Sequence, residues 1–161
     1  MTENVAASSL VEIPAAAPDV FFVGIDIYRS ILHPIREADR LTWSISGERY
    51  VDTDDEVMFR VWGDLGVVEA GWFSGSTVVG LIGFRGEAVP EDDRSNDDLL
   101  AVYGPWAAHV LWDLAATAVR LAAAQSVGVN FGLSSLTPTP HLLLERDRAG
   151  ATPPEEPVRA D

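Results

Sequence analysis

Hydrophobic and polar residues alternate with a period of two along three stretches of the first half of the chain, at 20–32, 41–52 and 56–64. In the third stretch the alternation separates Val57, Phe59 and Val61 from Met58, Arg60 and Trp62. In the first stretch it places five apolar side chains on one face: Phe21, Val23, Ile25, Ile27 and Ile31. This period predicts strands that have one face in a core and the other in contact with water.

A fourth extended segment is predicted at 67–84, and it differs from the others because glycine interrupts it repeatedly. Leu65–Gly66 predicts the turn that leads into it. Residues 78–84 are apolar on both faces, so this part is expected to be covered on both sides. The glycines mark positions where bulges or the close approach of another backbone are common: Gly71, Gly75, Gly80 and Gly83.

A helical pattern follows within residues 97–140. Gly104–Pro105 predicts the helix start, with proline at the first helical position, and the pattern ends before Gly128. Polar side chains recur along one narrow stripe, and almost every other position is apolar or small. The stripe consists of His109, Asp113, Thr117 and Arg120.

The apolar surface of this helix is wider than the arc of about 100° that a helix on one side of a monomer needs. Two interpretations follow: the helix lies inside the core of a monomer, or it packs between its own domain and a second copy of the chain. The second interpretation assigns six residues to an oligomer interface: Trp106, Val110, Trp112, Asp113, Leu114 and Thr117.

The chain places its strands first and its helices last, an order typical of α+β proteins. We predict an antiparallel four-stranded sheet, with a long and bulged last strand, followed by helices that pack on one face. Residues 19–144 are expected to form a single domain. Residues 1–18 have the composition of a flexible arm, and 145–161 that of a disordered, acidic and proline-rich tail.

The formal net charge of −14 would repel nucleic acid and anionic lipid, and it favours a basic partner. The chain has no cysteine, which excludes disulfides and thiolate metal sites. No basic segment follows Met1, and no apolar run approaches the ~18 residues of a membrane span. We therefore expect a cytoplasmic protein that does not insert into a membrane.

Few residues have a pattern typical of catalysis. The glycines lack the spacing of a phosphate-binding loop, and the three histidines are too far apart in sequence to predict a metal site. His109, Asp113 and Thr117 lie along a line on the helix, whereas the groups of an active site converge. We expect a non-enzyme without metal or cofactor. The alternative is a small-molecule enzyme that uses His109 with Asp113, or Asp26 with His33.

Large apolar side chains occur where the strand pattern predicts a polar face. Met58 and Trp62 lie opposite the predicted core face, and Trp72–Phe73 lies in the glycine-rich segment. Methionine and aromatic side chains suit a surface that accepts many shapes. A small second core under a helix or a dimer partner explains the same residues.

The order and spacing of these elements resemble the SecB family of protein-export chaperones over residues 20–140. Local matches are Phe59–Val61, the glycine-broken segment Phe73–Phe84, Leu111–Trp112, and the connection from Asn130–Phe131 to Pro140. Asp113 stands where the family has a proline after the Leu-Trp pair. Leu114–Ala116 stands in place of an Ala-Arg-Glu run.

The resemblance implies a SecB-like fold assembled as a dimer of dimers, with helices between the sheets and apolar grooves outside. Members bind non-native polypeptides without ATP and pass them to the SecA translocase, and some relatives protect an antitoxin. On this basis we predict a holdase whose client groove includes Trp43, Met58, Trp62, Trp72, Phe73 and Phe131. A module dedicated to one partner, such as an antitoxin, remains the alternative.

Overall fold

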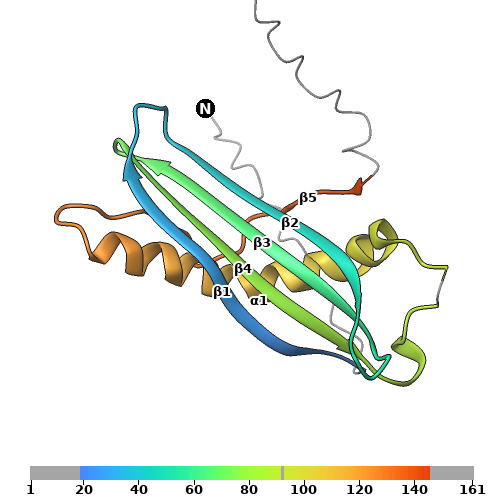
Figure 1. The fold of residues 1–161 in the computed structure, drawn as a ribbon. Coiled ribbons are helices and arrows are strands. Elements are labelled where there is room, and N and C mark those ends of the chain that lie inside the picture. The colour runs from blue at the N-terminus through green and yellow to red at the C-terminus, as the bar shows by residue number, and fades with distance from the viewer. Residues whose placement is uncertain (1–18, 92, 146–161) are drawn as a thin grey trace, which may run out of the picture.

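The computed structural model describes residues 19–91 and 93–145 (Figure 1). The arm predicted at 1–18 lies outside the described residues, as does the predicted tail after Glu145. The described chain forms one sheet with a single long helix behind it. Its elements are β1 (Val20–Pro34), β2 (Arg40–Val51), β3 (Val57–Glu69), β4 (Trp72–Phe84), a short 3₁₀ turn η1 (Gly86–Ala88), α1 (Asn96–Ala124) and β5 (His141–Leu142).

The strand order is β1-β4-β3-β2-β5, and the first four strands pair antiparallel. The predicted α+β class is confirmed, but the sheet has five strands and is mixed, because β5 pairs in parallel with β2. After α1 the chain returns along the free edge of β2 and pairs there only through His141 and Leu142. Two residues are too few to produce a period, so the sequence pattern did not predict this strand.

The turn predicted at Leu65–Gly66 is wrong. Both residues lie inside β3, opposite Ser76 and Gly75 of β4. The chain reverses instead at Ala70 and Gly71, whose φ angles are 50° and 80°. Two successive positive φ angles are typical of a tight hairpin whose twist matches that of the strands.

The helix start predicted at Gly104–Pro105 is also wrong. Ser95 caps the N-terminus of α1: its Oγ accepts the backbone N–H of Asp98 at 3.1 Å, and the Asp98 carboxylate in turn accepts the N–H of Ser95. This capping box satisfies two backbone donors at the helix end, which allows α1 to begin at Asn96. Pro105 consequently lies within the helix.

One face of the sheet packs on α1, and we call it the inner face. Small residues such as Ala107 and Ala115 are fully buried there and let the helix approach the strands closely. Trp112 meets Trp43 of β2 edge-on at 5.5 Å between ring centroids. Phe22 of β1 stacks on Trp106 at 4.7 Å. These contacts make the sheet and the helix one hydrophobic core.

The chain after α1, residues 129–145, closes the side of this core next to β2, and we call it the strap. Phe131 and Leu144 bury their side chains in the core. The Arg120 guanidinium donates to the carbonyl of Leu133 at 3.2 Å, and His109 Nδ1 lies 2.8 Å from Thr137 Oγ1. No described segment covers the opposite, β1 side in the same way, so the two long sides of the core differ.

The two faces of β1 do not follow the simple alternation predicted from the sequence. Its register with β4 shifts between Phe22 and Gly24 and again between Ile27 and Arg29. Each shift inserts one extra residue and so exchanges the faces of the residues beyond it. The five apolar residues predicted to share one face are therefore divided: Ile25 and Ile27 lie opposite inner residues of β4, whereas Phe21 and Ile31 lie opposite outer ones.

Aromatic rings from neighbouring strands cover several glycines of the sheet. A Cβ added to Gly63 would lie 2.5 Å from the Trp43 ring, and one added to Gly80 would lie 2.4 Å from the ring of Phe22. These rings are packed against the inner face and have little space in which to move. The glycines of β3 and β4 thus make room for aromatic side chains in the core.

We expect Gly63→Ala to lower the free energy of unfolding by about 1–3 kcal/mol, because the new methyl group would displace the buried ring of Trp43. Gly24→Ala is the matched control, since a Cβ at Gly24 meets no atom within 4 Å. Urea unfolding followed by tryptophan fluorescence measures both variants. Equal stability of the two variants would contradict this explanation of Gly63.

Candidate binding surface

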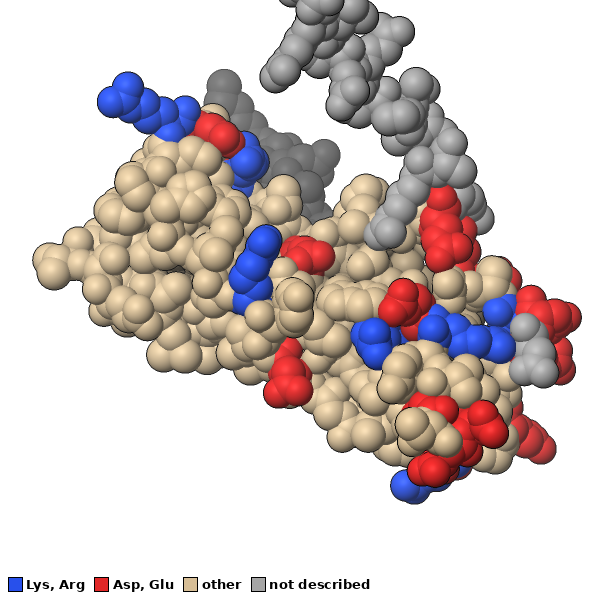
Figure 2. Space-filling view, in the orientation of Figure 1, with Lys and Arg blue, Asp and Glu red and all other residues tan. Residues whose placement is uncertain are grey.

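The face of the sheet opposite α1, here the outer face, is not covered by any helix among the described residues. Figures 1 and 2 look onto this face, and its central part carries few charged side chains. Cross-strand register places one row of residues directly across it. From the β1 edge inward, this row consists of Asp26, Val79, Trp62 and Ser46.

Arg60 lies close to two aromatic rings on the outer face. Its guanidinium carbon is 4.4 Å from the centroid of the Tyr50 ring and 5.8 Å from that of Trp62. Its Nη1 also lies 3.3 Å from Glu48 Oε1. A cation over an aromatic ring is stabilised by about 0.5–1 kcal/mol at an exposed site. The Arg60 charge is thus paired with Glu48, and the rings of Tyr50 and Trp62 remain available for contact with a partner.

A hollow of about 540 Å³ opens beside this stack, and we call it the outer hollow. It reaches from β3 across β4 to the edge of the sheet at β1. Tyr28, at the second register shift of β1, is 78% exposed at its rim. The lining residues are Asp26, Ile27, Tyr28, Arg60, Trp62 and Val79. The hollow thus combines apolar and aromatic walls with one charge of each sign.

A second aromatic contact lies at the other end of the outer face. Phe73 lies over the glycine pair Gly66 and Gly75, since Cβ atoms added there would lie 3.6 Å and 3.0 Å from its ring. The rings of His33 and Phe73 are 5.1 Å apart. Apolar surface is therefore present at both ends of the outer face.

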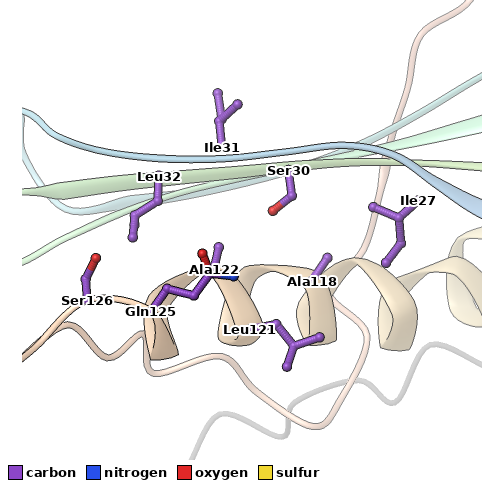
Figure 3. A pocket seen from close by; sticks show the side chains of 9 residues that line it. All are labelled: Ile27, Ser30, Ile31, Leu32, Ala118, Leu121, Ala122, Gln125 and Ser126. Carbon is purple, nitrogen blue, oxygen red and sulfur yellow. The ribbon is translucent and has the colours of Figure 1, made fainter.

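A further cleft of about 510 Å³ lies at the β1 side of the core, between β1 and the C-terminal half of α1. Figure 3 shows Ile27, Ser30 and Leu32 directed from β1 toward the helix, whereas Ile31 points away from it. Leu121, on the helix side of the cleft, is 59% exposed. This side cleft is the part of the core that the strap does not close.

The structure divides the six residues predicted to form a client groove. Met58, Trp62 and Phe73 lie on the outer face, although Met58 is largely buried. The others lie on the inner side: Trp72 packs against the core, and Trp43 and Phe131 are buried in it. Client binding by any of these residues stays a prediction, but the structure gives Trp43 and Phe131 a packing role.

The outer hollow also contains residues that the sequence pattern did not select: Ile27, Tyr28, Arg60 and Val79. Tyr28 alternates with the apolar residues predicted for 20–32, which predicts a face in contact with water, and its exposure agrees with this. Its position beside Trp62 depends on strand order, because β1 and β3 are both neighbours of β4. No local signal in the sequence gives this adjacency.

Five of the six residues predicted to form an oligomer interface are not fully buried in the single chain, although Trp106 stacks on Phe22 of β1 and Leu114 packs against the core. Trp106, Val110 and Leu114 are half-buried, and Asp113 and Thr117 are exposed. Trp112 is the exception: it is 1% exposed, and its ring packs against Trp43. Assigning Trp112 to an intermolecular interface is therefore wrong for the folded chain. The role of the other five stays a prediction.

Acidic side chains gather at the end of the molecule where the β2–β3 turn and the N-terminus of α1 lie (Figure 2). The turn alone carries Asp52, Asp54, Asp55 and Glu56. Asp52 Oδ1 accepts the backbone N–H groups of Asp54 and Glu56 at 2.9 Å, so this carboxylate shapes the turn. The turn thus places four acidic residues close together at this end of the molecule.

Two of the residues on the polar stripe of α1 have structural partners. His109 contacts Thr137 of the strap, and Thr117 Oγ1 donates to the carbonyl of Asp113 within the helix. Among residues 19–91 and 93–145, no group of three or more His, Asp or Glu side chains could hold a metal ion. Within the same residues, no helix is both long and apolar enough to cross a membrane.

No protein-family model matches this chain, and no curated protein matches it in sequence. Among solved structures, the chain is similar to the SecB-like chaperone Rv1957 of Mycobacterium tuberculosis, in complex with a ChAD peptide from the Rv1956 HigA1 antitoxin. The two chains are 12% identical with a TM-score of 0.43, over 72% of this chain and 88% of that chain. This similarity is too distant to transfer residue roles from that chaperone to this chain.

Proposed function

We propose that this protein is an ATP-independent holdase that binds extended segments of non-native polypeptides on the outer face of its sheet. The observation that carries the proposal is the outer hollow, where Trp62, Val79 and Tyr28 supply apolar and aromatic contact without a covering element among the described residues. An exposed apolar hollow on an otherwise acidic chain of net charge −14 is typical of an interaction site.

Such a holdase needs no nucleotide, because mass action is sufficient. A protein that binds the unfolded form of a client and not its folded form shifts the client's folding equilibrium toward the unfolded side. At a free chaperone concentration of 100 times Kd, the shift amounts to about 2.7 kcal/mol. That is a large part of the stability of a marginal domain, so the client remains unfolded while it is bound.

Two further surfaces support assembly into a homo-oligomer. The first is the free edge of β1, which pairs only with β4 within the described residues. Antiparallel pairing of two β1 edges about an axis between Ile27 and Tyr28 would bring Asp26 to Arg29 of the partner subunit. Both side chains are exposed, and neither forms an ion pair with a described residue, so their charges are available for this contact.

The second surface is an apolar ridge along α1, in which residues recur every four positions, although two of them, Trp106 and Leu114, also pack against the core of their own chain. Val102, Trp106, Val110 and Leu114 form this ridge and remain exposed or half-buried. Ridges of this spacing can interlock with those of another helix. Two different symmetric interfaces, one at β1 and one at α1, generate a dimer of dimers. The outer faces of the sheets would then point outward and be free to bind clients.

A SecA-type translocase and an antitoxin are the partners that the resemblance to SecB implies. The acidic end of the molecule supports a contact with a basic surface in either case, since opposite charges speed association. A choice between these partners requires binding measurements with each one.

The test is suppression of aggregation of an unfolding client protein, in the absence of nucleotide and at a near-stoichiometric ratio. Light scattering of the protein alone gives its mass, and we expect four times the mass of one chain. A folded protein that suppresses no aggregation of several clients, yet binds one specific partner, would instead support a module dedicated to that partner.

A further inference from the structure

The side cleft exposes apolar side chains on both of its walls. Leu121 of α1 is 59% exposed, and Ile27 of β1 is 44% exposed. None of the 9 lining residues carries a charge, and their polar groups are two serine hydroxyl groups and the amide of Gln125. Apolar side chains that lie together on a surface are typical of a contact site. A segment with an uncharged, apolar face therefore fits this cleft.

Two segments of the chain outside the described residues are candidates for covering the cleft, and their sequences differ. Residues 146–161 contain one large apolar side chain, Val158, among prolines, alanines and charged residues. They follow Glu145, whose N–H donates to Asp97 Oδ1 in the first turn of α1. The cleft lies toward the other end of this helix. The arm before β1, in contrast, contains the sequence Leu-Val-Glu-Ile at residues 10–13.

The distance from this sequence to β1 matches the position of the cleft. The arm joins β1 at Val20, and the carbonyl of Asp19 accepts the N–H of Arg85 there at 2.9 Å. Ile27, at the end of the cleft nearer to this point, is about 23 Å along the strand from Val20. Val11 is nine residues before Val20, so an extended chain carries it about 30 Å, or about 24 Å if two residues reverse the direction. An arm that runs back along β1 thus brings Val11 to Ile27.

The local sequence of the arm suits this path. Side chains of an extended segment alternate, so Val11 and Ile13 point to one side and Glu12 to the other. Val11 and Ile13 can therefore face the apolar cleft while Glu12 remains in water. The connection to β1, Pro-Ala-Ala-Ala-Pro at residues 14–18, has a proline at each end, and proline favours an extended spacer.

We propose that residues 10–13 bind in the side cleft of their own chain, with Val11 and Ile13 against Ile27 and Leu121. The arm then closes the β1 side of the core as the strap closes the β2 side. While it is bound, the cleft is closed to clients and to other copies of the chain. A short tether gives an effective concentration in the millimolar range, so a contact too weak for a free peptide is sufficient within one chain. The outer hollow is a different surface, and this inference does not depend on the holdase function.

Cysteine cross-linking tests the contact, because the chain has no cysteine of its own. Val11→Cys with Leu121→Cys places one thiol on the arm and one in the cleft. Val11→Cys with Val51→Cys is the matched control. Val51 is 51% exposed and ends β2, level with the start of β1 and three strand intervals of about 4.8 Å away. An arm without a preferred site reaches both positions.

With oxidised glutathione as the oxidant, we expect the first pair to form a disulfide within one chain at least tenfold faster than the control pair. Non-reducing gels and the mass of the intact protein identify the product. Equal rates for the two pairs, or no disulfide in the first pair, would overturn the inference. A disulfide between two chains would also overturn it, because the arm would then bind to another copy.

Loss of the apolar residues of the arm provides an independent readout. The double variant Val11→Asp, Ile13→Asp should open the cleft and raise the binding of the neutral dye Nile red at least twofold, since carboxylates are costly to bury against apolar walls. Ala6→Asp, Ala7→Asp adds the same charge outside residues 10–13 and is expected to leave dye binding unchanged. An equal response of the two double variants would mean that residues 10–13 do not cover the cleft. Neither readout uses a client, so failure here leaves the holdase proposal intact.

Discussion

Leu114→Arg is expected to split the oligomer and leave each chain folded, whereas Leu111→Arg is expected to unfold it. The two leucines are neighbours on α1, but Leu111 is fully buried against the sheet, whereas Leu114 is half-buried at the margin of the core. An arginine at Leu111 would place an unpaired charge in the core, with a cost of several kcal/mol. At Leu114 the charge remains hydrated in the single chain and is buried only in the assembly.

Circular dichroism reports the fold of both variants, and light scattering reports their mass. Val110→Arg, one turn earlier on the same ridge, should behave as Leu114→Arg does. If Leu114→Arg keeps the mass of the unchanged protein, the ridge of α1 is not an interface. If it unfolds like Leu111→Arg, the far side of the helix belongs to the core of one chain.

Trp62→Ser is expected to weaken client binding by about 10–30-fold without loss of the fold. Removal of a large aromatic side chain from the centre of a binding site costs about 2 kcal/mol in affinity. Trp62 provides an apolar wall of the outer hollow and contacts the Arg60 guanidinium. The measurement is the concentration of protein that halves the aggregation of an unfolding client, with peptide affinity as a second readout.

Trp72→Ser is the matched control for this variant. Trp72 is also a half-buried tryptophan of the central strands, but it lies on the inner side and packs against the core. The Trp72→Ser variant should have a lower free energy of unfolding and a nearly unchanged affinity for the client. Both variants are compared below their unfolding temperatures. Equal losses of affinity would mean that the outer hollow is not the main binding site.

Much of the fold could be predicted from the sequence because strands and helices have different periods. The alternation through Phe59, Val61 and Trp62 gave the correct two faces of β3, since this strand has no register shift. In β1 the same reasoning failed, because two inserted residues exchange the faces and nothing in the residue types marks them. The helix start was misplaced because proline is common at the first helical position, whereas here the Ser95–Asp98 capping box sets the boundary.

The candidate site could be predicted only in part. Met58 and Trp62 were selected because they are large and apolar on a predicted polar face, and both lie on the outer face. Trp43 is predicted to belong to the same groove, but it packs against Trp112 in the core. Size and apolarity alone do not distinguish a binding residue from a core residue. A large apolar side chain is stabilised by burial both in a core and in contact with a bound partner.

The sequence by itself determined the order of four long strands followed by one long helix, though not all of their ends, together with the acidic charge, because these depend on local period and composition. Only the tertiary structure decided that β1 is an open edge and that the strap closes the opposite side of the core. It also decided that Tyr28, Val79 and Trp62 meet in one hollow. These features depend on strand order and on register, and both are set by contacts between residues that are far apart in the chain.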